Sequence, residues 1–265
     1  MHLEDEFGDI VQKARQGKGL SIEEIAPLTN ISSDDWRQME AYKRGPTEEE
    51  LGRICQALDL APGPLSAIWQ DHYQPDSPPM VQSWGRIHQV TAPDTGSHCY
   101  ILTQGNYCLI IDPGAPGRAI LPHISGQLSA ILLTHTHADH VAGLEELLER
   151  YPVPVIVGEN EDFPGPHRRP IKEGTTLPWG EVKVEIIPSP GHTPGGLAFY
   201  LPGALFSGDT IFAGSLGRAR GPVAYQQLLD SSRRLTGLPA EVGLFPGHGP
   251  LSTIGQELKH NPFIT

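Results

Sequence analysis

Four side chains that can bind a metal ion lie within six residues of one another, directly after an apolar run. Residues 130–133 predict a buried strand, and the candidate ligands follow it: His135, His137, Asp139 and His140. Imidazoles with a carboxylate suit Zn²⁺ or Fe²⁺, whereas Mg²⁺ and Ca²⁺ prefer sites made of oxygen atoms. A helix predicted to begin at this cluster would anchor it to the core through Val141, Leu144, Leu147 and Leu148.

The same arrangement, a strand followed by a tight turn that offers one ligand, recurs three times further along the chain. The turns after residues 187, 206 and 245 carry, in that order, His192, Asp209 and His248. A single turn of this kind is usually structural. Four of them in one chain predict that the strand ends gather at one edge of the sheets, where they form a single metal centre.

The chain divides into two segments with different hydrophobic patterns. Residues 1–73 predict an all-α domain of five helices, residues 74–80 a stiff Pro-rich linker, and residues 81–265 a second domain. In the second domain we expect strands at residues 97–102, 107–111, 130–133, 153–157, 182–187, 197–200 and 205–206, and helices at 141–151 and 224–235. This order predicts an α+β protein whose second domain is a layered sandwich.

The first segment contains three capping boxes, or their acidic variant, and each opens a predicted helix. The pairs are Ser21 with Glu24, Ser32 with Asp35, and Thr47 with Glu50. Asn30 lies between the second and third helices, where a left-handed backbone is expected. Together with residues 14–26 and 46–60, this order resembles the Cro/C1-type helix-turn-helix family of phage repressors. The resemblance implies a DNA-binding module.

The charge of this segment argues against DNA as its partner. Residues 1–74 hold 7 basic and 14 acidic side chains, in a chain of 265 residues with a net charge of −12. The expected groove-reading helix, residues 33–40, begins with Asp34 and Asp35. Because Lys and Arg supply the affinity for phosphates, we expect weak DNA binding or none, and a role in self-association or protein contact. The alternative is a small basic edge formed by Arg37, Gln38, Lys43 and Arg44.

The composition and the first residues of the sequence indicate in which cellular compartment the protein is expected. No apolar run approaches the ~18 residues that a membrane-spanning helix needs. The first residues are acidic and lack the basic n-region of a secretory signal, and the three cysteines form no disulfide framework. We therefore expect a cytoplasmic protein without a membrane partner, and we leave homo-oligomerisation open.

From about residue 96 onward, the candidate ligands in their order resemble those of the metallo-β-lactamase fold superfamily, an αββα sandwich with a metal site at its edge. By this resemblance, His135, His137 and His192 bind one metal ion. Asp139, His140 and His248 bind a second, and Asp209 bridges the two. The resemblance also implies that Asp139 orients the attacking hydroxide, and that Asp112 is a structural acid beside the site. Two divalent ions are expected, with Zn²⁺ favoured and Fe²⁺ or Mn²⁺ as alternatives.

Residues 208–218 and 246–257 resemble the short glyoxalase II-like hydrolases, which the family associates with thioesters such as hydroxyacylglutathione. Three features depart from that branch. Gly196 stands in place of a second histidine, and Arg218 is followed by Ala219, Arg220 and Gly221 without the usual acid. In addition, the sequence after His248 is too short for the helical domain that binds glutathione in the full-length enzymes.

These features together predict a dinuclear metal-dependent hydrolase of a small thioester or ester, with metal-bound hydroxide as the nucleophile. Two close metal ions lower the pKa of a shared water, and no Gly-x-Ser-x-Gly elbow offers a side-chain nucleophile instead. One alternative is a mononuclear iron persulfide dioxygenase, which would share His135, His192 and Asp209. The other is a regulator whose metal domain senses a ligand for the helix-turn-helix segment.

Overall fold

The computed structural model describes residues 2–171 and 174–264, so residues 1 and 265, the outer limits of the two predicted domains, lie outside the described residues. The N-terminal segment forms α1 (Phe7–Gly17), α2 (Ile22–Thr29), α3 (Ser33–Glu40), α4 (Glu48–Leu58) and α5 (Pro62–Trp69). The predicted caps are confirmed, because Ser21, Ser32 and Thr47 each accept a hydrogen bond from the backbone N–H three residues later. Asn30 has the predicted left-handed backbone, with φ 51°.

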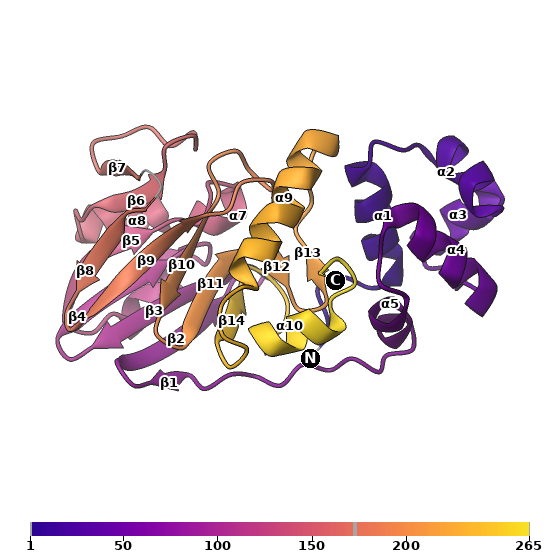
Figure 1. Ribbon diagram of the computed structural model, residues 1–265. Helices are drawn as coiled ribbons and strands as arrows, with labels where there is room; N and C mark the ends of the chain where they lie inside the picture. Colours follow the sequence, from indigo (N-terminus) through magenta and orange to yellow (C-terminus); the bar gives the residue numbers. More distant parts are fainter. Residues whose placement is uncertain (1, 172–173, 265) are drawn as a thin grey trace.

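Two sheets form the body of the second segment (Figure 1). The first has the order β1 (Val81–Gln82), β2 (Gly85–Thr91), β3 (His98–Gln104), β4 (Tyr107–Ile111), β5 (Gln127–Leu132), β6 (Val155–Gly158) and β7 (Arg168–Ile171). The second has the order β15 (Ser252–Thr253), β14 (Gly243–Pro246), β11 (Ala204–Gly208), β10 (Leu197–Leu201), β9 (Val182–Pro188) and β8 (Thr176–Trp179). A small hairpin pairs β12 (Ile211–Phe212) with β13 (Ser215–Leu216).

Helices cover the outer faces of both sheets, which gives the predicted αββα sandwich. The first sheet is covered by α6 (Gly117–Ile120), the 3-10 turn Leu121–His123, α7 (Ala138–Val141) and α8 (Leu144–Arg150), and the second by α9 (Pro222–Leu235) and α10 (Ile254–His260). Alternation along β4 explains the layers. Leu109 and Ile111 belong to the apolar cluster between the sheets, whereas Ile110 belongs to the cluster on the other face, which includes Leu147 of α8. None of the described helices is both long and apolar enough to cross a bilayer.

The predicted helix at residues 141–151 is wrong in one respect, since two short helices, α7 and α8, replace it. Gly143 lies between them and donates its N–H to the carbonyl of Pro113 at 2.8 Å. A Cβ at Gly143 would lie 2.2 Å from the carbonyl oxygen of Ala115, so the chain passes too close here for a larger residue. The prediction also missed β2, β7 and β8, whose side chains are largely exposed or half-buried and give no strong apolar signal.

The N-terminal helices pack against the second sheet's outer helices (Figure 1). Buried residues of both segments form one continuous apolar cluster, in which α1 packs against α9. Gly17 at the end of α1 lies so close to Tyr225 of α9 that a Cβ would be 2.5 Å from the ring. After α5, the Tyr73 hydroxyl donates to the buried Glu257 carboxylate of α10 at 2.8 Å. These contacts bring α1 next to the loops that carry the candidate ligands.

Candidate metal centre

Parallel strand pairs bring the candidate ligands together. The pairs β4 with β5 and β11 with β14 are parallel, so the carboxyl ends of each pair meet at one edge of its sheet. His135 and His137 lie in the turn after β5, Asp209 follows β11, and His248 follows β14. His192 comes from the turn that joins β9 to β10. All seven side chains predicted as metal ligands gather at this edge.

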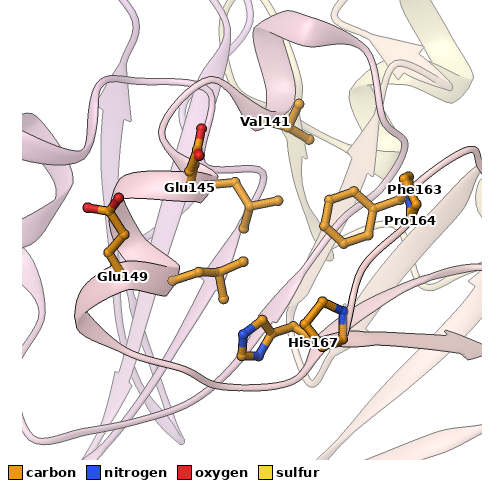
Figure 2. A pocket seen from close by; sticks show the side chains of 9 residues that line it. Val141, Glu145, Glu149, Phe163, Pro164 and His167 are labelled. Carbon is orange, nitrogen blue, oxygen red and sulfur yellow. The ribbon is translucent and has the colours of Figure 1, made fainter.

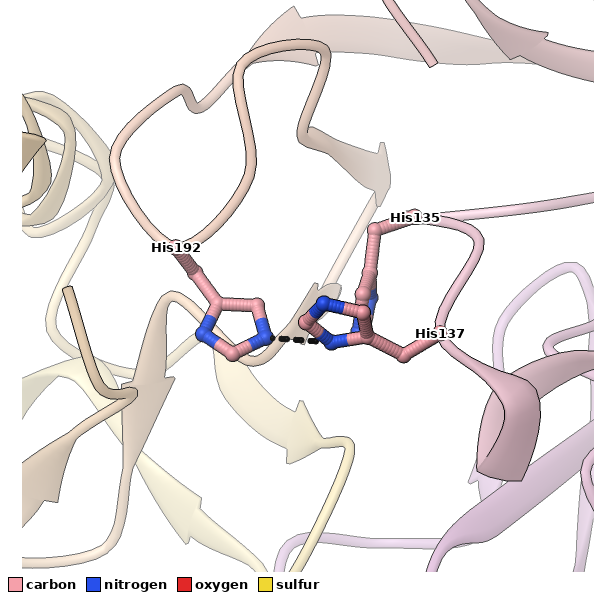
Figure 3. A group of neighbouring side chains, drawn as sticks. All are labelled: His135, His137 and His192. Atoms are coloured by element: carbon pink, nitrogen blue, oxygen red, sulfur yellow. Dashed lines mark hydrogen bonds between the residues drawn. The ribbon is translucent and has the colours of Figure 1, made fainter. Parts of the chain in front are cut away.

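The first group consists of His135, His137 and His192, the three residues assigned to the first metal by resemblance. One ring nitrogen of each lies within 4.8 Å of the others. Nε2 of His192 and Nδ1 of His137 form a hydrogen bond of 2.9 Å (Figure 3). Three imidazole nitrogens at this spacing can share one tetrahedral cation.

The second group consists of Asp139, His140 and His248, the three residues assigned to the second metal. Oδ2 of Asp139 lies 3.2 Å from Nε2 of His248 and 3.8 Å from Nε2 of His140. The backbone carbonyl of Asp139 accepts a hydrogen bond of 2.6 Å from the Ser97 hydroxyl of the neighbouring turn, which fixes the start of α7.

The carboxylate of Asp209 lies between the two groups. Its Oδ2 is 3.5 Å from Nε2 of His192 and 3.9 Å from Nε2 of His248, and its Oδ1 is 3.3 Å from Nε2 of His140. A Cβ at Gly247 would lie 2.2 Å from Oδ1 of Asp209, so the turn that carries His248 can approach only because residue 247 is a glycine. This position between the groups is the one that a bridging ligand requires.

A second observation also indicates that the site suits divalent cations: it buries polar atoms that have no hydrogen-bond partner. Among the described residues, Nε2 of His135, Nε2 of His140 and Oδ1 of Asp209 are buried and lack a hydrogen-bond partner of good geometry. Unpaired buried polar atoms are costly and rare in proteins. Because these three atoms converge on the space between the two groups, cations bound there would satisfy them.

The charges of the cluster also favour cations. Burial alone would raise the pKa of Asp209, but His140, His135 and His192 outweigh it and hold that pKa well below its usual range. Burial, together with the neighbouring histidines, lowers the pKa of His135. Burial would lower the pKa of His140 too, but the Asp209 and Asp112 carboxylates hold it well above its usual range. A cation that binds His140 must therefore displace its proton.

Asp112, predicted as a structural acid, orients His140. Its carboxylate accepts hydrogen bonds of 2.7 Å from the backbone N–H of Thr134 and 2.5 Å from the Thr134 hydroxyl, and it lies 3.1 Å from Nδ1 of His140. When Nδ1 of His140 donates to this carboxylate, Nε2 is left free to bind a cation. Asp112 therefore orients the His140 ring through Nδ1, the nitrogen that does not face the candidate metal position.

Sequence reasoning missed the contribution of Glu161. This buried side chain accepts hydrogen bonds from the N–H and hydroxyl of Thr136, at 3.0 and 2.8 Å, and from the N–H of Gly195, at 3.0 Å. It thus ties the turn of His135 and His137 to the turn of His192. No local signal separates Glu161 from the acids beside it in the sequence. His98 stays outside the cluster, since its Nε2 bonds the carbonyl of Gly249 at 2.7 Å.

Helix α1 and the segment after β13 form the wall of the site on the side of His192. Nδ1 of His192 bonds the backbone carbonyl of Arg218 at 2.8 Å. The guanidinium of Arg218 in turn donates to the side-chain oxygens of Gln12, at 3.1 Å, and Gln16, both on α1. The N-terminal helices thus support a residue that orients one of the candidate ligands.

The second segment is similar to known proteins. The family model described as "Metallo-beta-lactamase superfamily" matches residues 92–248. The hydroxyacylglutathione hydrolase of Aeromonas salmonicida is 37% identical over 158 residues, which make up 58% of this chain and 61% of that protein. This chain therefore spans less than two thirds of that relative's length. The "Probable metallo-hydrolase YqgX" of Bacillus subtilis is 31% identical over 196 residues, which cover 63% of this chain and 92% of YqgX.

Solved structures share the sandwich. The crystal structure of TTHA1623 in a di-iron-bound form has a TM-score of 0.59 and 34% identity, and the match covers 66% of this chain and 99% of that one. The family match begins at residue 92, so it does not include helices α1–α5.

Proposed function

The chain belongs to the metallo-beta-lactamase superfamily, and we propose on that basis that it is a dinuclear metal-dependent hydrolase of a small thioester or ester. The observation that carries the proposal is the pair of ligand groups with the Asp209 carboxylate between them. The hydroxyacylglutathione hydrolases to which the chain is similar support a thioester as the substrate.

The ligand assignment of the proposal follows the two groups. His135, His137 and His192 would hold one ion, Asp139, His140 and His248 the other, and Asp209 both. Zn²⁺ suits this mixture of imidazole and carboxylate best, with Fe²⁺ and Mn²⁺ as alternatives. Two such ions would polarise the substrate carbonyl and make a water nucleophilic at neutral pH.

The role proposed for Asp139 is to orient the attacking water. Its side chain is partly exposed while the other members of its group are buried, so it is the carboxylate of that group that solvent and substrate can reach. A hydrogen bond from the water to Oδ2 of Asp139 would direct the oxygen lone pair toward the carbonyl carbon.

The test of this function is hydrolysis after controlled metal loading. We expect protein stripped with a chelator to be inactive toward S-lactoylglutathione, and reloading with Zn²⁺, Mn²⁺ or Fe²⁺ to raise kcat/KM by about 100-fold or more. Free thiol release measures the rate, and metal analysis of the same samples gives the stoichiometry. Oxygen consumption with a persulfide substrate, without turnover of any ester or thioester, would instead support the mononuclear iron dioxygenase.

We propose further that the N-terminal helices do not read DNA. Arg44, part of the basic edge predicted as the alternative, bonds Oδ1 of Asp35 at 2.9 Å and both oxygens of Glu50. These bonds lower the pKa of Glu50 to about 2, so the ion pair persists at neutral pH. Arg37 pairs with Glu23, although an exposed pair of this kind is weak. Few cations are left to neutralise phosphates.

A titration of the intact chain tests this second proposal. We expect fluorescence anisotropy of a labelled mixed-sequence duplex to show no saturable binding up to about 10 µM protein at low salt, because phosphate contacts supply non-specific affinity. Saturable binding near micromolar concentration that salt weakens and that Arg37→Ala abolishes would establish a working DNA-binding module.

A further inference from the structure

A cavity of about 380 Å³ borders the candidate metal centre. His137 and His192 of the first ligand group line it, and Thr193 lies beside them. The opposite side comes from Arg220 and from the first turns of α9, through Ala224 and Gln227. A molecule bound at the first metal position would have this cavity next to it.

Arg220 is the charged residue of the cavity. Its side chain is exposed, and among the described residues it makes no hydrogen bond or ion pair. The neighbouring arginines differ, since Arg218 is held by Gln12 and Gln16, and Arg233 near the end of α9 pairs with Asp230 at 3.0 Å. The guanidinium of Arg220 therefore keeps its donors free for a ligand.

The position of Arg220 relative to the ligand group is fixed by the backbone. Arg218, two residues earlier, accepts the hydrogen bond from Nδ1 of His192 through its carbonyl. Pro222, two residues later, begins α9, which packs in the core through Leu228. Arg220 is thus held between a candidate ligand and a rigid helix, although its side chain is free.

The charge of the cavity is opposite to that of the chain. The chain carries a net charge of −12, yet none of the described residues that line this cavity has a carboxylate. A larger groove of about 570 Å³ over α8 is lined by Glu145 and Glu149 among apolar side chains, and no candidate ligand lines it (Figure 2). An anionic substrate is repelled by the chain as a whole and finds a local cation beside the metal centre.

We propose that this cavity binds a carboxylate of the thiol portion of the substrate, and that Arg220 is the residue that recognises it. A guanidinium binds a carboxylate through two parallel hydrogen bonds, and the Gln227 amide, on the same side of α9 as Ala224, can donate a further one. The inference rests on the proposed thioester hydrolysis, which places the reacting carbonyl at the ligand groups. The thiol portion is chosen because it carries the carboxylates in the substrate for which the similar hydroxyacylglutathione hydrolases are named.

The experiment compares two substrates that differ only in their carboxylates, S-lactoylglutathione and its diethyl ester. For Arg220→Gln we expect the KM of S-lactoylglutathione to rise about 10-fold to 100-fold with kcat nearly unchanged, and the kinetics of the diethyl ester to stay as in the wild type. Arg220→Lys should recover part of the loss, since lysine keeps the charge without the planar pair of donors. Arg233→Gln, on the neighbouring helix α9, is the matched control and should change neither substrate's kinetics.

A binding measurement separates the failure of this inference from failure of the proposed function. Calorimetric titration with S-methylglutathione, a thioether that cannot be hydrolysed, should show a Kd that Arg220→Gln raises by the same factor. Equal affinity in wild type and Arg220→Gln, or no binding to the wild type, would overturn the inference whether or not thioesters are hydrolysed. If the wild type binds the thioether through Arg220 but hydrolyses neither substrate, the proposed reaction fails while the carboxylate site stands.

Discussion

Replacing Asp209 with alanine is expected to release metal from both ligand groups and to lower kcat/KM for the thioester by roughly 1000-fold or more, about 4 kcal/mol of transition-state stabilisation. The reason is the position of the carboxylate, which lies within 4.0 Å of ring nitrogens from both groups. Loss of a residue that binds only one ion would leave the other ion in place, whereas Asp209 lies against both ligand groups. Metal analysis after dialysis against limiting free metal, together with thiol release, measures both effects.

The matched control for this variant is Asp230→Ala. Asp230 lies exposed on α9 and bonds only Gln226 and Arg233 among the described residues, so metal content and rate should match those of the wild type. Circular dichroism of Asp209→Ala verifies that the sandwich is intact. An Asp209→Ala protein that keeps its full metal content and reacts within 10-fold of the wild-type rate would refute the bridging role.

The second large effect is expected for Asp112→Asn, which should lower metal affinity at the group of Asp139, His140 and His248 by about 10-fold to 100-fold. The Thr134 backbone N–H donates to Oδ1 of Asp112, and Nδ1 of His140 faces Oδ2, so an asparagine with a single acceptor oxygen places its NH2 group against one of these two donors. The ring of His140 then loses the partner that leaves its Nε2 free. Metal analysis at a series of buffered free-metal concentrations measures the change.

The same variant should destabilise the metal-free protein by about 1–3 kcal/mol, because a buried donor loses its acceptor. Asparagine is the appropriate substitution because Asp112 has φ 49°, a left-handed backbone that asparagine also tolerates, so no backbone strain is added. Urea unfolding measures the change, with Asp94→Asn in an exposed turn as the control. Unchanged stability and metal affinity in Asp112→Asn would mean that another group orients His140.

Local sequence signals predicted the helices of the first segment well. Residues 33–40 form the predicted third helix, and the capping residue Ser32 precedes it. A cap is a contact between residues three positions apart, so the sequence contains the whole interaction. The same holds for alternation along β4, because neighbouring residues of a strand must face opposite sides. Helix α8 was less predictable, since its break at Gly143 depends on the carbonyl of Ala115, 28 residues earlier.

For the metal centre, the sequence supplied the residue types but not their arrangement. His135 and His137 are two residues apart in the chain and stay close in any fold, whereas His248 lies beside Asp209 because β11 and β14, which they follow, are parallel neighbours. The orienting role of Asp112 and the tie made by Glu161 between two turns likewise require the packed sheets. Such contacts join residues tens of positions apart, so no local pattern encodes them.

The sequence by itself determined the helices of the first segment, most of the central strands, the αββα class by resemblance and the list of candidate ligands. Only the tertiary structure decided that α1 supports Arg218 beside His192, and that Arg220 lines a cavity next to the first ligand group. The physical reason is the distance along the chain between the residues that interact. Hydrogen bonds of a helix turn and the alternation of a strand act between residues a few positions apart, whereas a site's charge and shape depend on which distant segments the burial of apolar side chains brings together.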